Sequence, residues 1–137
     1  MKDFELDPRL AADSHWLADQ ALCQVRLMDD IRFPWLVLVP RVAGAVEWFD
    51  LAESDQHLLF DEVSQVARLL RERSGCEKIN IGALGNIVRQ LHVHVLARSV
   101  GDAAWPGPVW GNGEAQRFTP AALETRLAEL RLQLAGR

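Results

Sequence analysis

The chain has 137 residues, the size of one globular domain, and we expect a single domain over residues 1–137 with its core within about 20–111. Its hydrophobic fraction of 49% and charged fraction of 25% are those of a folded protein rather than a disordered one. The net charge is −4 and no run of lysines or arginines occurs, which argues against an extended nucleic-acid surface or a membrane as partner.

Cysteine usage and the start of the chain predict a cytoplasmic protein. Cys23 and Cys76 lie far apart and match no metal-binding or redox spacing, so we expect reduced thiols. Residues 1–13 carry charges where a signal peptide needs an apolar stretch. No apolar run reaches the ~20 residues that a membrane-spanning helix requires.

The first third of the chain predicts a helix followed by two strands. Residues 8–20 are typical of a short helix with a proline in its first turn. Alternating polarity predicts a strand over 21–28, and two consecutive aspartates then indicate a turn at 29–30. The apolar run at 35–39, bounded by prolines, favours a buried central strand.

The rest of the chain predicts a long helix, two strands and a final helix. Apolar residues at helical spacing predict a helix over 54–73 with Ser54 as its N-cap. Strands are expected at 78–83 and 88–97, and a helix at 119–135. The order of elements predicts an α+β fold, with a mainly antiparallel sheet of about five strands, the long helix packed on it, and helices near both termini.

Three polar side chains alternate with apolar ones near the end of this predicted sheet. In a strand over 88–97, Gln90, His92 and His94 would point to one face and the intervening apolar residues to the core. A polar row on a mid-sheet strand is costly if it is buried without partners. Either this face is solvated, or it is a site where the imidazoles bind a metal or carry out chemistry.

Metal binding and nucleophilic catalysis are the two functional alternatives. His92 and His94 could hold zinc, iron or copper with a third ligand, but the other histidines, His15 and His57, are not placed beside them by the sequence. A neutral imidazole can instead attack phosphorus when its second nitrogen donates to a carbonyl. Adjacent polar residues on the same face would then contact phosphate oxygens or the leaving group.

The segment Gln90–Ala97 resembles the signature of the histidine triad (HIT) superfamily, with glutamine in place of the first histidine. The apolar strand at 35–41, with its proline and arginine, and the segment 46–51 before the long helix are also similar to the family. The continuation at 98–102 resembles the Fhit-like and bacterial branch. The resemblance covers roughly residues 20–111 and implies the HIT-like α+β fold.

The resemblance implies a hydrolase or transferase of nucleotide derivatives that needs no metal or other cofactor. His92 would attack the α-phosphorus to form a nucleotidyl-histidine, which water would then release as a nucleoside monophosphate. His94 would donate to phosphate or orient the site. Gln90 differs from the histidine of the family signature, because an amide cannot gain or lose a charge near neutral pH. The protein is therefore either active, on phosphoramidates or dinucleoside polyphosphates, or a nucleotide-binding module with little turnover.

Two further positions differ from the residues usual in the family, and these differences concern the identity of the substrate rather than the fold. Ile87 occupies the region where many members place a serine or threonine that contacts phosphate. Leu27 or a neighbour stands where an asparagine or aspartate often binds the ribose, and Asp29 or Asp30 could substitute for it.

The remaining candidates for substrate contact are two asparagines and a tryptophan. Asn80 lies near where many members carry an amide facing the nucleotide, and Asn86 lies in the turn that follows. Trp105 and Trp110 could stack on a base or anchor their loop, and Trp105 is preferred because it follows the triad strand closely. The family commonly forms dimers, so the expected assembly is a homodimer.

Overall fold

A computed structural model of the chain describes residues 3–136 and contains one five-stranded antiparallel sheet in the order β1-β2-β3-β5-β4. The strands are β1 (Ser14–Asp19), β2 (Cys23–Met28), β3 (Trp35–Pro40), β4 (Lys78–Gly82) and β5 (Val93–Arg98). The helices are α1 (Pro8–Asp13), α2 (Glu53–Ser74) and α3 (Pro120–Ala135), with a 3₁₀ turn, η1 (Trp48–Asp50). This arrangement confirms the predicted α+β fold class.

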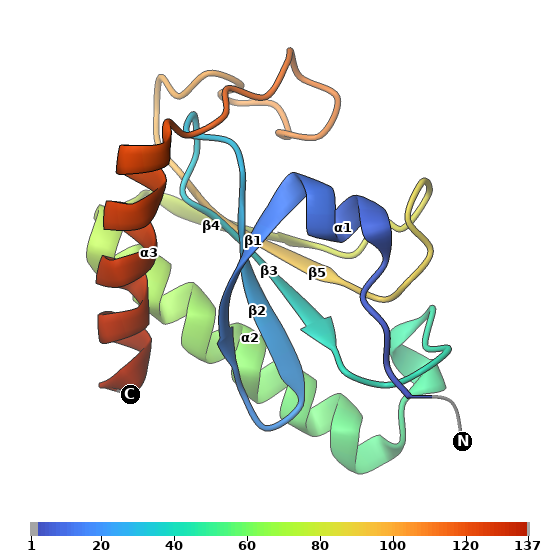
Figure 1. The fold of residues 1–137 in the computed structure, drawn as a ribbon. Helices are drawn as coiled ribbons and strands as arrows, with labels where there is room; N and C mark the ends of the chain where they lie inside the picture. Colours follow the sequence, from blue (N-terminus) through green and yellow to red (C-terminus); the bar gives the residue numbers. More distant parts are fainter. Residues whose placement is uncertain (1–2, 137) are drawn as a thin grey trace.

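The main core lies between one face of the sheet and α2, as Figure 1 shows. β3 is buried along its whole length because it pairs with β2 on one side and β5 on the other. Leu36 and Leu38 of β3 face the apolar stripe of α2, which includes Val66 and Leu70. α3 adds Leu130 and its neighbours to the same cluster, so its leucine stripe packs within the monomer.

A second apolar cluster covers the opposite face of the sheet, where α1 lies (Figure 1). Trp35 and Val37 of β3 pack there with Leu10 of α1. Residues 3–7, which we call the N-terminal arm, run along this cluster, and Phe4 and Leu6 of the arm pack against it. This second face is thinner than the first because only a short helix and loops cover it, and this leaves room for a cavity.

The predicted helix over 8–20 is wrong in its second half. The helix ends at Asp13, and Ser14 begins β1 with extended backbone angles of φ −147° and ψ 167°. β1 pairs with β2, and its register shifts between Trp16 and Ala18. This bulge breaks the two-residue alternation by which a strand is recognised in a sequence. Pairing with β2 therefore decided a conformation that the local pattern did not reveal.

The predicted strand over 88–97 is shorter in the structure and begins only at Val93. β4 ends at Gly82 opposite His94, and β3 pairs no further than Leu38 opposite Val93. Residues 88–92 therefore lie outside the ladder, in the loop before β5. Gln90 and His92 are loop residues, and the expectation of three polar side chains along one strand is corrected.

The ends of α2 and α3 agree with the sequence except at the N-cap of α2. Ala52 is the N-cap of α2 in place of Ser54, and the acidic residues of the first turn favour the positive end of the helix dipole. Gly75 ends α2 in the left-handed region at φ 66°, where a residue without a Cβ is least strained. At α3, Thr119 caps the helix as predicted by accepting from the Ala122 backbone N–H.

No helix within residues 3–136 is both long and apolar enough to cross a membrane.

Candidate active site

A cavity of about 590 Å³ opens beside the start of β5, on the face of the sheet that carries α1. His92 and His94 lie in it together with Trp35 and Trp110. Its walls come from α1, the end of β2, the loop at 84–88 and the segment at 109–117. Segments far apart in the sequence therefore converge on the two histidines.

The His92 ring is held by the backbone of the loop that precedes β5. His92 Nδ1 lies 2.6 Å from the carbonyl oxygen of Gln90, and the side chain is only 6% exposed. A carbonyl can only accept a hydrogen bond, so Nδ1 carries the proton. The lone pair of His92 is therefore on Nε2, the atom available for attack on an electrophile.

The His94 ring has the opposite arrangement because a tryptophan donates to it. Trp35 Nε1 lies 3.0 Å from His94 Nδ1, and both side chains are buried. An indole N–H can only donate, so His94 Nδ1 is the acceptor and the proton is on Nε2. Burial, and to a lesser degree the neighbouring His92, lowers the pKa of His94 to about 3. His94 is consequently a neutral hydrogen-bond donor at physiological pH.

The two rings form an edge-to-face pair with centroids 4.9 Å apart. One ring carries a free lone pair on Nε2 and the other carries an N–H on Nε2. A nucleophile and a hydrogen-bond donor are thus adjacent in a largely apolar part of the cavity, where electrostatic interactions are stronger than in water. Covalent acyl and phosphoryl transfer can both use this combination.

Trp110 closes the cavity on the other side of His94, with ring centroids 5.5 Å apart. Its ring lies over Gly82, the residue opposite His94 in β4. A Cβ at Gly82 would lie 2.9 Å from Trp110 Cη2, closer than carbon atoms can approach. The glycine therefore makes room for the indole.

Asn86 and Ile87 both line the cavity, although Ile87 is 77% exposed. Two other predicted contacts lie outside it. Asn80 accepts a hydrogen bond from Arg98 Nη1 at 2.9 Å, and Trp105 lies beneath the same guanidinium, which is 5.8 Å from its ring centroid. Both side chains contact the buried Arg98 instead, so of the two predicted tryptophans it is Trp110, not Trp105, that lines the cavity.

Gln90 does not contribute to the lining of this cavity. Its side-chain amide is engaged by the N-terminal arm, where it accepts from the Asp7 backbone N–H and donates to the Glu5 carbonyl. The structure therefore brings His92 and His94 together and directs the third predicted side chain elsewhere.

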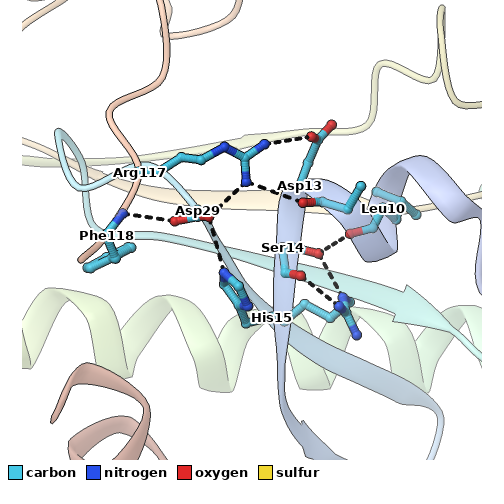
Figure 2. Close-up of polar contacts among 9 residues, drawn as sticks. Leu10, Asp13, Ser14, His15, Asp29, Arg117 and Phe118 are labelled. Carbon is cyan, nitrogen blue, oxygen red and sulfur yellow. Dashed lines mark hydrogen bonds and ion pairs between the residues drawn. The ribbon is translucent and has the colours of Figure 1, made fainter. Parts of the chain in front are cut away.

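The two aspartates proposed for a ribose lie in the cavity wall but already hold protein donors. Asp29 accepts from the Phe118 backbone N–H at 2.9 Å and from Arg117 Nη1 at 2.8 Å, and His15 Nε2 lies 3.2 Å away (Figure 2). Burial alone would raise the pKa of Asp29, but these hydrogen bonds outweigh it and keep the pKa below its ordinary value.

Asp30 is bound in the same manner by Arg32, whose Nη2 lies 2.8 Å from Oδ2. The Gln116 backbone N–H also donates to this carboxylate. Together the two aspartates fix the segment before α3 against the β2 end of the sheet. That segment forms one side of the cavity, so the acidic pair shapes the site.

The His92–His94 pair is a poor metal site in this arrangement. Among residues 3–136, no three histidine, cysteine, aspartate or glutamate side chains gather into a group that could hold an ion. A metal on His94 Nε2 would also require the proton to move to Nδ1, where it would face the Trp35 N–H. Two donors cannot pair, so binding would cost a buried hydrogen bond.

Sequence reasoning missed Trp35 as a site residue, and it preferred Trp105 to Trp110. Trp35 lies in an apolar run and is read as core, and no local pattern reveals that its N–H reaches a histidine. A signal for Trp110 does exist. Gly82 interrupts the predicted strand, and a glycine inside a strand often marks the close approach of another group.

The imidazoles of His92, in the loop before β5, and of His94, on β5, thus lie together in a cavity on one face of an antiparallel sheet. A sequence model described as the HIT domain matches residues 9–101. A search of curated protein sequences gives no significant match. The chain belongs to the HIT family, whose members generally bind or hydrolyse nucleotides.

Solved structures of histidine triad proteins are similar over nearly their whole length. One from Sinorhizobium meliloti 1021 is 51% identical with a TM-score of 0.92, over 95% of this chain and 96% of that one. One from Bradyrhizobium japonicum is 43% identical with a TM-score of 0.92, over 96% and 98%. One from Marinobacter aquaeolei VT8 is 42% identical with a TM-score of 0.95, over 98% of each chain.

Replacing Trp35 by phenylalanine should allow His94 to populate both of its neutral tautomers. The change keeps an aromatic ring and removes the N–H, so a population protonated on Nδ1 is expected to appear. Long-range proton–nitrogen correlation NMR reads the tautomer from the ring ¹⁵N shifts. Trp16→Phe, which removes a surface indole hydrogen bond to Asp19, should leave His94 unchanged. An unaltered tautomer in Trp35→Phe would contradict the role of the indole.

The low pKa of His94 predicts a loss of stability in mild acid. Between pH ~6.5 and about 3, the unfolded chain binds a proton at His94 that the folded chain does not, so the free energy of unfolding falls as pH is lowered. Urea denaturation at pH 7 and pH 5 should show a loss about 2 kcal/mol smaller in His94→Gln than in the wild type. His57→Gln, at an exposed histidine, is the control. Equal losses in wild type and His94→Gln would refute this assignment.

Proposed function

We propose that this protein hydrolyses or transfers nucleotide derivatives at the α-phosphorus through a covalent intermediate on His92. The observation that carries the proposal is the pair of neighbouring imidazoles held in opposite tautomers at the wall of a 590 Å³ cavity. Membership of a family that generally binds or hydrolyses nucleotides supports the choice of substrate class.

In the first step, the lone pair of His92 Nε2 attacks the α-phosphorus and forms a P–N bond. The bond from phosphorus to the leaving group breaks, and its electron pair departs with the leaving group. His94 Nε2–H donates to a phosphoryl oxygen and stabilises the negative charge that builds up there. The proton stays on His92 Nδ1, and the hydrogen bond that it donates to the Gln90 carbonyl stabilises the imidazolium that results.

In the second step, water attacks the phosphorus of the nucleotidyl-histidine. The P–N bond breaks and its electron pair returns to His92 Nε2, which is neutral again. The nucleoside monophosphate leaves with the oxygen of that water, and one proton of the water is released to solvent. Because His94 stays neutral, it can donate in both steps without changing its charge state.

The cavity wall offers contacts for the nucleoside portion. Trp110 presents an aromatic ring at the cavity wall, and Asn86 offers an amide that can donate and accept.

Cys23 and Cys76 are free and buried, which supports a cytoplasmic location for the reaction. The alternative is a module that binds nucleotides in this cavity but turns them over slowly.

Activity assays on matched histidine variants test the proposal. We expect the wild type to hydrolyse a fluorogenic adenosine phosphoramidate or a diadenosine polyphosphate, and His92→Ala to lower kcat by more than about 10³-fold, because it removes the nucleophile. Quenching in alkaline denaturant, which preserves the acid-labile P–N bond, followed by peptide mass spectrometry should recover a nucleotidyl adduct on His92.

His57→Ala is the matched control, since His57 is an exposed histidine on α2 that lies far from the cavity lining. It should retain wild-type turnover. AMP binding without turnover by the wild type would favour the binding module, and turnover that survives His92→Ala would refute the proposed nucleophile.

We further propose that the protein forms a homodimer through β4. This strand is at the edge of the sheet, and Ile81 on it is 54% exposed. An edge strand with free backbone groups and exposed apolar side chains can pair with a second copy. Ile81→Lys should shift the mass measured by sedimentation equilibrium from dimer to monomer, whereas Ile31→Lys, at another exposed isoleucine, should not. A monomeric wild type would refute this assembly.

A further inference from the structure

Both ends of the Gln90 side-chain amide are bonded to the N-terminal arm. Gln90 Oε1 accepts from the Asp7 backbone N–H at 2.9 Å, and Gln90 Nε2 donates to the Glu5 carbonyl at 2.8 Å. The two backbone groups belong to residues two apart, as in the rungs that a neighbouring strand would offer. The side chain therefore stands in for a strand partner of the arm.

The arm that Gln90 holds leads directly into the cavity wall. Asp7 is the N-cap of α1, and its carboxylate accepts from the Arg9 backbone N–H at 2.8 Å. α1 then contributes Arg9, Leu10 and Asp13 to the lining. A shift of Asp7 would consequently move the start of α1 and the side chains that face the cavity.

The backbone of Gln90 holds the proposed nucleophile at the same time. Its carbonyl oxygen lies 2.6 Å from His92 Nδ1 and sets the tautomer of that ring. One residue thus bonds to the imidazole of His92 through its main chain and to the N-terminal arm through its side chain.

We infer that Gln90 is a positioning residue that fixes the N-terminal arm and α1 relative to His92, and so sets the width of the cavity for its substrate. What the cavity binds rests on the proposed function, whereas the clamp itself does not. The clamp needs one group that donates and one that accepts at fixed positions, which an amide supplies at every physiological pH. A histidine at this position would make the arm contacts depend on protonation.

Amide exchange measures the clamp without any substrate. In Gln90→Ala, the Asp7 backbone N–H loses its acceptor, and its exchange rate measured by NMR should rise by about tenfold. Gln56→Glu is the matched control, because Gln56 also donates to a backbone carbonyl, at Leu51, but lies away from the arm. Exchange at Asp7 should not change in that variant. Unchanged exchange in Gln90→Ala would overturn the proposal.

Gln90→Glu gives a second measurement that does not depend on how well the alanine variant folds. The carboxylate still accepts from the Asp7 backbone N–H, but it cannot donate to the Glu5 carbonyl and repels that oxygen. The arm should therefore be held less tightly, and exchange at Asp7 should be faster than in the wild type at neutral pH. Protonation of the carboxyl near pH ~4 restores a donor, and protection of Asp7 should return relative to Gln56→Glu at the same pH. Protection that is equal in both variants at neutral pH would contradict the clamp.

Kinetics separate positioning from participation in the reaction. Gln90→Ala should raise KM, or the Kd for AMP measured by calorimetry, by about tenfold while kcat and its pH profile stay within about twofold. A large fall in kcat with unchanged KM would show that Gln90 acts on the reacting groups and would overturn the inference. If the wild type has no turnover, the proposed function fails, and the exchange and AMP-binding measurements still decide the clamp.

Discussion

The hydrogen bond from Trp35 to His94 sets the chemical character of the cavity. Because an indole can only donate, it forces the proton of a buried, neutral imidazole onto the nitrogen that faces the ligand space. The Gln90 carbonyl imposes the opposite tautomer on His92, 4.9 Å away between ring centroids. The difference between two chemically identical side chains is thus created entirely by their partners.

Sheet register makes this interaction possible. Val37 lies directly opposite His94, and Trp35 is two residues along the same strand, on the same face. Such diagonal neighbours are about 7–8 Å apart, within reach of a long aromatic side chain but not of a small one. On the other side of His94, Gly82 leaves space for Trp110. The histidine is therefore enclosed by aromatic rings from two directions.

The two faces of the sheet differ in what covers them and in what they contribute to the protein. The face toward α2 and α3 is a continuous apolar core that stabilises the domain. The face toward α1 is closed by short segments, which are joined to it by polar contacts: the arm by Gln90, and the segment before α3 by Asp29 and Asp30. A rigid sheet with loops fastened to it in this manner can hold a reactive site at fixed geometry.

The sequence by itself determined the central strand β3, the long helix α2 and the capped helix α3, because their apolar periodicity and end signals are local. It also singled out His92 and His94 as candidate site residues, which the structure places together in the cavity. Only the tertiary structure decided that β1 is a strand, that Gln90 bonds to the arm, and that two tryptophans enclose the site. A bulge hides the strand. The partner of Trp35 lies 59 positions away in the sequence and that of Gln90 lies 83 positions away, so no local pattern could record these contacts.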